Sequence, residues 1–132
     1  MTSNDKLVLN LRYLGRVGRN ALNTIAPTCI LADLTTPSGE IRWRFVTDCG
    51  LMPAGDGQTL LPNFNALKDG KKIDAVFITH LHTDHVGALP RLLPYLATQA
   101  RIFLSDPTWA MLEHVLDDCI KVSRSQGQEI YN

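Results

Sequence analysis

Apolar residues gather in short stretches along the chain, separated by polar residues, glycine and proline. Stretches of this length that are rich in β-branched and aromatic residues predict strands. In the first third of the chain they cover residues 6–13, 28–34 and 41–47. The tetrad Thr36-Pro37-Ser38-Gly39 predicts a turn between the last two strands. In residues 41–47 two arginines, Arg42 and Arg44, alternate with apolar side chains, and we expect them to form the exposed face.

The second half predicts a strand, helix, strand unit over residues 73–79, 86–96 and 101–104. Such a crossover favours parallel strands whose carboxyl ends gather ligands at one edge. Pro94 is expected to bend or end the middle helix early. A last helix over 107–122 is predicted from its apolar periodicity, with Ser105 or Asp106 as its cap and Pro107 at its first position. A glycine-rich loop over 48–57 and a short helix closed by Gly70 precede the unit.

The run from Thr79 to Gly87 carries the candidate chemistry, because it holds three histidines and an aspartate where the strand over 73–79 ends. In an extended segment His80 and His82 project to the same side and Leu81 to the other. Asp84 and His85 fall near the start of the next helix and approach from a second direction. A lone histidine is usually packed or solvated, but four such residues this close together favour a metal site.

Neutral imidazoles and carboxylates suit zinc, and they also suit manganese or iron. Four ligands divided into two pairs indicate two metal positions. A two-metal centre can polarise a substrate oxygen and supply hydroxide at neutral pH, so we expect a divalent-metal hydrolase.

The pattern His80-x-His82-x-Asp84-His85 after a strand resembles the signature of the metallo-β-lactamase fold superfamily. Two upstream segments are similar to that superfamily as well: 47–51 to its aspartate-x-glycine turn, and Leu14-Gly15 with Gly18 to its opening hairpin. The segments 86–90, 101–108 and 123–131 resemble the RNA-processing branch called β-CASP nucleases. The resemblance implies an α/β fold (α+β in part): part of an αββα sandwich, with a mixed sheet and flanking helices.

The resemblance also implies roles for individual residues. His80 and His82 would hold one Zn²⁺, and Asp84 and His85 the other, with Asp84 also placed to take a proton from the bridging water. Asp48 would fix the tautomer of a liganding histidine; the alternative is an ordinary aspartate that ends a strand before the Gly50 turn.

Members of the superfamily complete this centre with further histidines and a bridging aspartate. After His85 the only histidine is His114, which lies opposite the apolar side of the last predicted helix and is interpreted as solvated. We therefore expect residues 1–132 to form the N-terminal portion of a larger metallo-β-lactamase-like domain and to have little activity alone. Its uncovered apolar surface predicts self-association or pairing with the missing C-terminal half.

Composition and charge indicate which classes of partner and which cellular location to expect. Thirteen basic and thirteen acidic residues balance, which counts modestly against an RNA substrate. Arg12, Arg16 and Arg19 cluster around the first predicted hairpin, and the arginines of the strand over 41–47 are expected to be solvated rather than to contact phosphate. No targeting or membrane segment is found, so a cytoplasmic location without membrane contact is expected. Cys29, Cys49 and Cys119 are an odd number and predict reduced thiols, with Cys49 a small buried residue.

Two functions stay open at this point. The first is an enzyme, for which RNA phosphodiester cleavage is favoured over hydrolysis of another ester. Thioesters, lactones and β-lactams are substrates elsewhere in the superfamily. The second is a non-catalytic fragment or interaction module that keeps the motif without a complete site.

Overall fold

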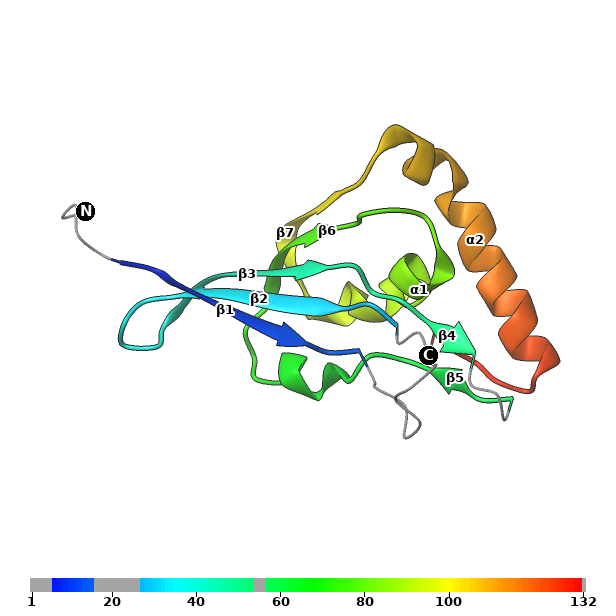
Figure 1. Cartoon of the computed structure of the whole chain (residues 1–132), viewed down its shortest axis with the longest axis horizontal. Helices are drawn as coiled ribbons and strands as arrows, with labels where there is room; N and C mark the ends of the chain where they lie inside the picture. The colour runs from blue at the N-terminus through cyan, green and yellow to red at the C-terminus, as the bar shows by residue number, and fades with distance from the viewer. Residues whose placement is uncertain (1–5, 16–26, 54–56, 132) are drawn as a thin grey trace, which may run out of the picture.

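The computed structural model describes residues 6–15, 27–53 and 57–131. In this part of the chain a five-stranded sheet has the order β1-β2-β3-β6-β7. The strands are β1 (Val8–Tyr13), β2 (Ile30–Thr35), β3 (Ile41–Thr47), β6 (Ile73–Phe77) and β7 (Leu96–Phe103). β1, β2 and β3 pair antiparallel, and β3, β6 and β7 pair parallel (Figure 1). The expected fold class, a mixed sheet with flanking helices, is confirmed.

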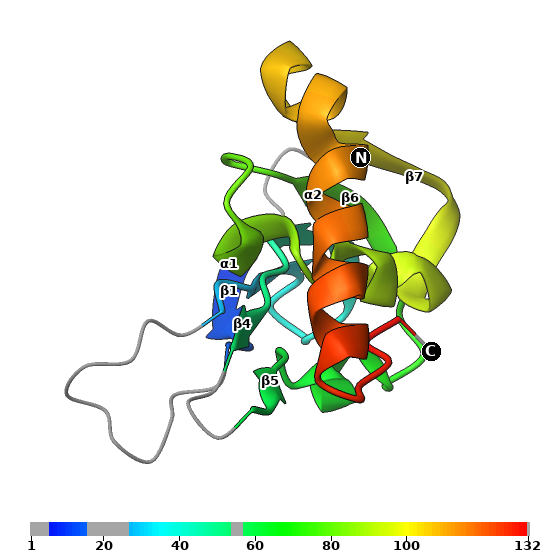
Figure 2. The ribbon, with the colours of Figure 1, turned by 90° about the vertical axis from the view of Figure 1, so that its right-hand side faces the viewer.

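The helical segments are η1 (Phe64–Leu67), α1 (Thr83–Val86), η2 (Leu89–Tyr95) and α2 (Asp106–Ser125). The stretch predicted as a loop over 48–57 contains the short strand β4 (Met52–Pro53), which pairs with β5 (Thr59–Leu60) just after it. Helix α2 stands across the end of the sheet beside α1 (Figures 1 and 2). None of the described helices is both long and apolar enough to cross a membrane.

The helix predicted over 86–96 is wrong in detail. The structure has the short helix α1, a break at Gly87 and Ala88, and the 3₁₀ segment η2. Pro90 and Pro94 have no N–H to donate, so a regular α-helix cannot run through this segment. Strand β7 therefore begins at Leu96, earlier than predicted, and its register with β6 shifts between the pairs Ile73↔Leu96 and Ala75↔Arg101.

Helix α2 follows its prediction closely. Ser105 is the N-cap, and its side chain accepts a hydrogen bond from the backbone N–H of Thr108. Pro107 occupies the second helical position, one later than expected. The buried face includes Leu112 and Cys119, while His114 is exposed, in agreement with its interpretation as a solvated residue.

One sequence prediction about β3 is reversed. The side chain of Arg44 is 0% exposed, whereas Trp43 on the other face of the strand is 40% exposed. The guanidinium of Arg44 donates to both carboxylate oxygens of Asp33 (2.7 and 3.0 Å) and of Asp69 (2.7 and 2.8 Å). Two carboxylates compensate the desolvation of the cation, so this arginine lies inside the protein. Only Arg42 is exposed as predicted.

The face of the sheet that carries Arg44 also forms the core. Leu31, Val46 and Val76 are at most 1% exposed and lie on this face together with Arg44. The helical segments that pack in the same core contribute buried side chains: Leu67 of η1, Val86 of α1, and Leu89 and Leu92 of η2.

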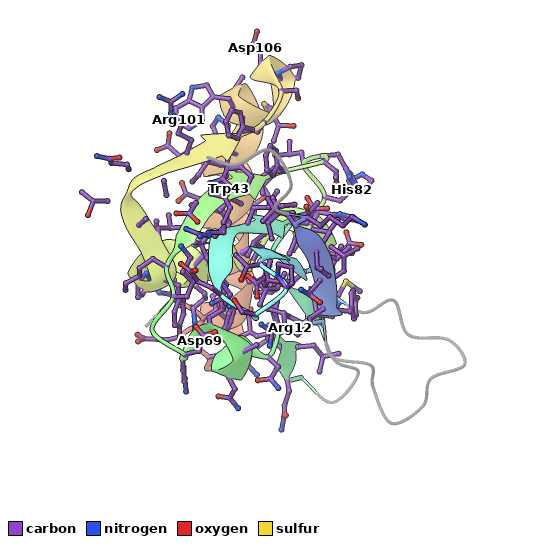
Figure 3. The ribbon with its side chains drawn as sticks, turned by 90° about the vertical axis from the view of Figure 1, so that its left-hand side faces the viewer. Arg12, Trp43, Asp69, His82, Arg101 and Asp106 are labelled. Carbon is purple, nitrogen blue, oxygen red and sulfur yellow. The ribbon has the colours of Figure 1, made fainter. Side chains whose placement is uncertain are left out.

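The opposite face of the sheet is apolar but open. We call it the open face and define it by Leu9, Leu11, Tyr13, Trp43 and Phe103, which are 40 to 63% exposed. Aromatic rings run across it in a chain of contacts: Trp43 to Phe45, Phe45 to Phe77, and Phe77 to Phe103. Figure 3 shows Trp43 on the opposite side of the sheet from Asp69 and Arg12. Large exposed apolar faces on a sheet indicate a surface built to be covered.

Candidate metal centre

The predicted ligands follow the carboxyl end of β6. The backbone N–H of Ile78 still pairs with the carbonyl of Phe103, and the chain then leaves the sheet and enters α1 at Thr83. The rings of His80 and His82 lie 4.7 Å apart, and Nε2 of His80 is 3.2 Å from Nδ1 of His82. Leu81 between them packs against the core, as the extended geometry predicts. Figure 3 shows His82 at the rim of the molecule.

The second predicted pair lies beside the first. His85, on α1, places its Nε2 3.5 Å from Oδ2 of Asp84. Its ring centroid is 3.9 Å from that of His80, so the two pairs adjoin. The side chains of Asp84 and His85 are 24 and 20% exposed, which leaves them accessible from solvent. The structure thus brings all four predicted ligands to one end of the sheet.

Asp48 lies beneath this cluster and is 2% exposed. Its Oδ2 is 2.9 Å from Nδ1 of His85, and its Oδ1 accepts the backbone N–H of Thr79 at 2.8 Å. Asp48 has a φ of 58°, a left-handed conformation that aspartate tolerates better than most residues. The backbone therefore turns at this residue while its carboxylate points at the histidines.

The segment after Asp48 holds α1 in place through its backbone. Cys49 donates to the carbonyl of His85 (2.7 Å) and accepts from Ala88 (2.9 Å), and Leu51 donates to Thr83 (3.0 Å). Between them, Gly50 donates to Thr28, and any Cβ at this position would overlap the backbone of Asp84. Because Gly50 has no side chain, the segment after Asp48 can contact the backbone of Asp84. The hydrogen bonds from Cys49 and Leu51 then fix the position of α1, and with it Asp84 and His85, relative to the sheet.

The donor spacing is compatible with bound cations. Tetrahedral zinc with Zn–N bonds of about 2.0–2.1 Å separates two nitrogen ligands by roughly 3.3 Å. The His80–His82 nitrogens are 3.2 Å apart, and the His85–Asp84 atoms are 3.5 Å apart. However, within the ranges that the structure describes, no group of three or more His, Cys, Asp or Glu side chains is arranged to hold a metal ion. The described residues thus offer two pairs of donors rather than a closed cage.

Cys49 follows Asp48 in the chain, but its thiol is buried against backbone. Its thiol is 0% exposed and donates to the carbonyl of Ala88 at 3.3 Å. Burial raises the pKa of this thiol well above its usual range, so it stays protonated and is a poor ligand. The three cysteines are free thiols, as predicted, and Cys29 and Cys119 are buried as well as Cys49.

Sequence reasoning assigned no role to two residues that shape the site. The hydroxyl of Thr79 contacts Asp48, His80 and His85. Tyr131 donates to the carbonyl of Gly87 at 2.7 Å and so attaches the end of the described chain to α1. The position of Thr79 directly before the first histidine suggests a role at the site, whereas nothing in the local sequence marks Tyr131.

Three residues singled out in the sequence, Arg16, Gly18 and Arg19, lie outside the described residues.

Comparison with known proteins places this arrangement in a family. Residues 44–121 match the metallo-beta-lactamase superfamily, and the chain belongs to that superfamily. The matched stretch begins on β3 and ends in α2, so it contains Asp48 and all four predicted ligands. Membership implies the use of divalent metal ions.

More particular similarity is to RNA-processing factors. The chain is 39% identical over 83 residues to cleavage and polyadenylation specificity factor subunit 3-I of Arabidopsis thaliana, covering 63% of this chain and 12% of that protein. It is 37% identical over 76 residues to endoribonuclease ysh1 of Schizosaccharomyces pombe, covering 58% and 10% respectively. The matched regions thus span about a tenth of the length of these relatives. The expected resemblance to β-CASP RNA-processing nucleases is confirmed.

Proposed function

We propose that this chain carries part of the ligand set of a two-metal hydrolase that cleaves phosphodiester bonds in RNA. The observation that carries the proposal is the pairing of donor atoms at the end of β6: His80 with His82, and Asp84 with His85, at spacings that a cation can bridge. Similarity to proteins named endoribonucleases supports RNA as the substrate class. Thioesters, lactones and β-lactams are then the alternative substrates to be tested.

In this proposal His80 and His82 would hold one ion, and Asp84 and His85 would hold the other. Zinc is the metal that the donor set favours, with manganese and iron as alternatives. Bound cations would supply positive charge to stabilise the phosphate in the transition state and would make water a better nucleophile.

The chain's own residues then prepare the site for reaction. The carboxylate of Asp84 is partly exposed and accepts a proton from the attacking water. The carboxylate of Asp48 accepts a hydrogen bond from Nδ1 of His85, which leaves the lone pair of Nε2 available to a cation.

Completion of the site requires further ligands. Catalytic zinc normally has three protein ligands, and each pair here offers two. We infer that another segment of the domain supplies the remaining donors and covers the open face of the sheet. Residues 1–132 would then form the N-terminal portion of the domain and hydrolyse little by themselves. The cytoplasmic location expected from the sequence stays a prediction.

A non-catalytic module is the second candidate. It is favoured by one observation, the lack of a three-donor group among the residues that the structure describes. The two candidates differ in whether the intact protein turns over substrate, because both keep the histidine pairs.

Metal binding tests the proposal before any substrate is chosen. Zn²⁺ titration of the chain, followed by calorimetry and metal analysis, should show binding that falls at least tenfold in His80→Ala/His82→Ala. His114→Ala is the matched control, because His114 is exposed on α2 away from the cluster. Equal Zn²⁺ binding by the wild type and the double variant would sink the metal assignment.

Substrate class is tested on the longer protein that carries this segment. Labelled RNA, the matching DNA, a thioester and a β-lactam are offered in parallel, with Asp84→Asn as the inactive comparison. We expect RNA cleavage that requires added metal and is lost in Asp84→Asn. A protein that binds metal but turns over none of the four substrates would favour the module.

A further inference from the structure

We infer that Thr79 is a positioning residue that transmits the orientation of Asp48 to His80 and so selects the ring nitrogen with which His80 can bind a metal. The inference rests on the proposed metal site and adds a residue to which no role has been assigned. Its starting point is the hydroxyl of Thr79, which lies 2.8 Å from Oδ2 of Asp48 and 3.0 Å from Nδ1 of His80.

The direction of these hydrogen bonds follows from the chemistry of the groups. An ionised carboxylate only accepts, so the single hydroxyl proton of Thr79 is donated to Asp48. Toward His80 the same oxygen has only lone pairs to offer. Nδ1 of His80 must therefore carry a proton and donate it, and Nε2 of this ring is left as an unprotonated nitrogen.

That nitrogen is the one that faces the other donor of the pair. Nε2 of His80 lies 3.2 Å from Nδ1 of His82, at the spacing expected for two ligands of one cation. If Thr79 did not accept from Nδ1, the proton could move to Nε2 and block the position. The hydroxyl thus decides whether His80 presents a lone pair or an N–H to the ion.

Asp48 acts on two histidines in different ways. It contacts Nδ1 of His85 directly at 2.9 Å, and it reaches His80 only through the Thr79 hydroxyl. Because Asp48 is 2% exposed and also accepts the backbone N–H of Thr79 at 2.8 Å, both partners are held against the same fixed carboxylate. One buried side chain therefore orients one histidine from each donor pair.

Three variants separate the hydroxyl from the rest of the side chain. Thr79→Val keeps the branched shape and the backbone N–H to Asp48 but has no hydroxyl. Thr79→Ser keeps the hydroxyl and loses a methyl group. Thr98→Val, on an exposed residue near the start of β7, is the matched control for the same chemical change.

The first readout needs no metal. Long-range ¹H–¹⁵N NMR of the metal-free chain at about pH 8 reports which nitrogen of each histidine carries a proton. We expect the Nδ1–H form of His80 in wild type, Thr79→Ser and Thr98→Val, and a shift toward the Nε2–H form in Thr79→Val. A wild-type His80 that is mainly Nε2–H, or a tautomer that is the same in Thr79→Val, overturns the inference.

The second readout is Zn²⁺ affinity measured by titration. Thr79→Val should bind about tenfold more weakly than wild type, and Thr79→Ser should restore binding. If no variant binds Zn²⁺ while the tautomer of His80 still depends on Thr79, the positioning role stands and the proposed metal centre fails. If Zn²⁺ binds equally to all four proteins, the positioning role fails and the proposed centre stands.

Discussion

The backbone of Asp84 occupies the space in which a side chain on Gly50 would begin. This contact joins the segment after β3 to the start of α1, and hydrogen bonds from Cys49 and Leu51 flank it on both sides. The position of one predicted ligand therefore depends on the absence of a side chain 34 positions earlier in the chain.

Gly50→Ala should displace α1. A Cβ would overlap the carbonyl of Asp84, which is backbone and cannot rotate away, so we expect a loss of about 1–3 kcal/mol in the free energy of unfolding. Urea denaturation measures it. Gly39→Asn is the control, because Gly39 lies in an exposed turn with open space around it and asparagine tolerates a positive φ. Equal stability of wild type and Gly50→Ala would show that the segments can separate at little cost.

Arg44→Met should destabilise the fold strongly. The substitution removes the buried cation and leaves Asp33, whose side chain is 6% exposed, with the half-exposed Arg12 at 3.1 Å as its remaining ion-pair partner; loss of one partner of a buried pair costs about 3 kcal/mol. Arg42→Met is the control, because Arg42 is 57% exposed and should change stability by less than about 0.5 kcal/mol. Adding Asp33→Leu to Arg44→Met removes the carboxylate that has lost its buried partner and should recover part of the loss. A mild effect of Arg44→Met alone would contradict the buried network.

Acid should weaken the same network at Asp69. Its hydrogen bond with Arg44 lowers the pKa of the Asp69 carboxyl below the value of about 3.9 in an unfolded chain. A lowered folded pKa means that the ionised form stabilises the protein above about pH 4, and that this contribution disappears as the pH falls through the folded pKa. The side chain is 42% exposed, so the effect is screened and should stay under about 1 kcal/mol.

Urea unfolding across a pH series checks this expectation. Wild type should be more stable than Asp69→Asn near neutral pH, and the two should converge in acid. Parallel curves for the two proteins throughout the acid range would contradict it.

The open face of the sheet should drive association of the isolated chain. Trp43 and Phe103 are 40 and 46% exposed there, and their burial in a contact with another copy is favourable. Trp43→Gln/Phe103→Gln should weaken self-association at least tenfold in sedimentation velocity. Trp109→Gln is the control, because Trp109 is 70% exposed but lies on α2 and is not part of the open face. A wild-type chain that stays monomeric at micromolar concentration would contradict the expectation.

Much of the site was predictable because its signal is local. The spacing of His80, His82, Asp84 and His85 at a strand end indicates convergent donors, and the structure brings them together. Thr79 is also marked locally, because it is a hydroxyl residue directly before the first histidine. Tyr131 could not be found in this way, because its partner Gly87 lies 44 positions away and the contact depends on how α2 folds back.

The positions of the strands could be predicted, but not which face of each strand points into the core. Alternation in β3 divides its residues between two faces without saying which face is inside. The natural interpretation was that the arginines lie on the exposed face. However, both faces of this sheet carry apolar residues, and Arg44 is paired with Asp33 and Asp69. The pairing with Asp69 crosses 25 positions, so only the three-dimensional structure reveals that this arginine is neutralised.

The turn between β2 and β3 offers a practical handle on the molecule. Residues 37–40 are exposed, and the turn is closed by its own hydrogen bonds between Thr36 and Glu40 and between Gly39 and Thr36. It lies at the end of β3 away from Asp48 and the histidines (Figure 1). A fluorophore or an immobilisation tag placed there would report on the chain, or anchor it to a surface, while the opposite end stays open to ions and to whatever binds beside them.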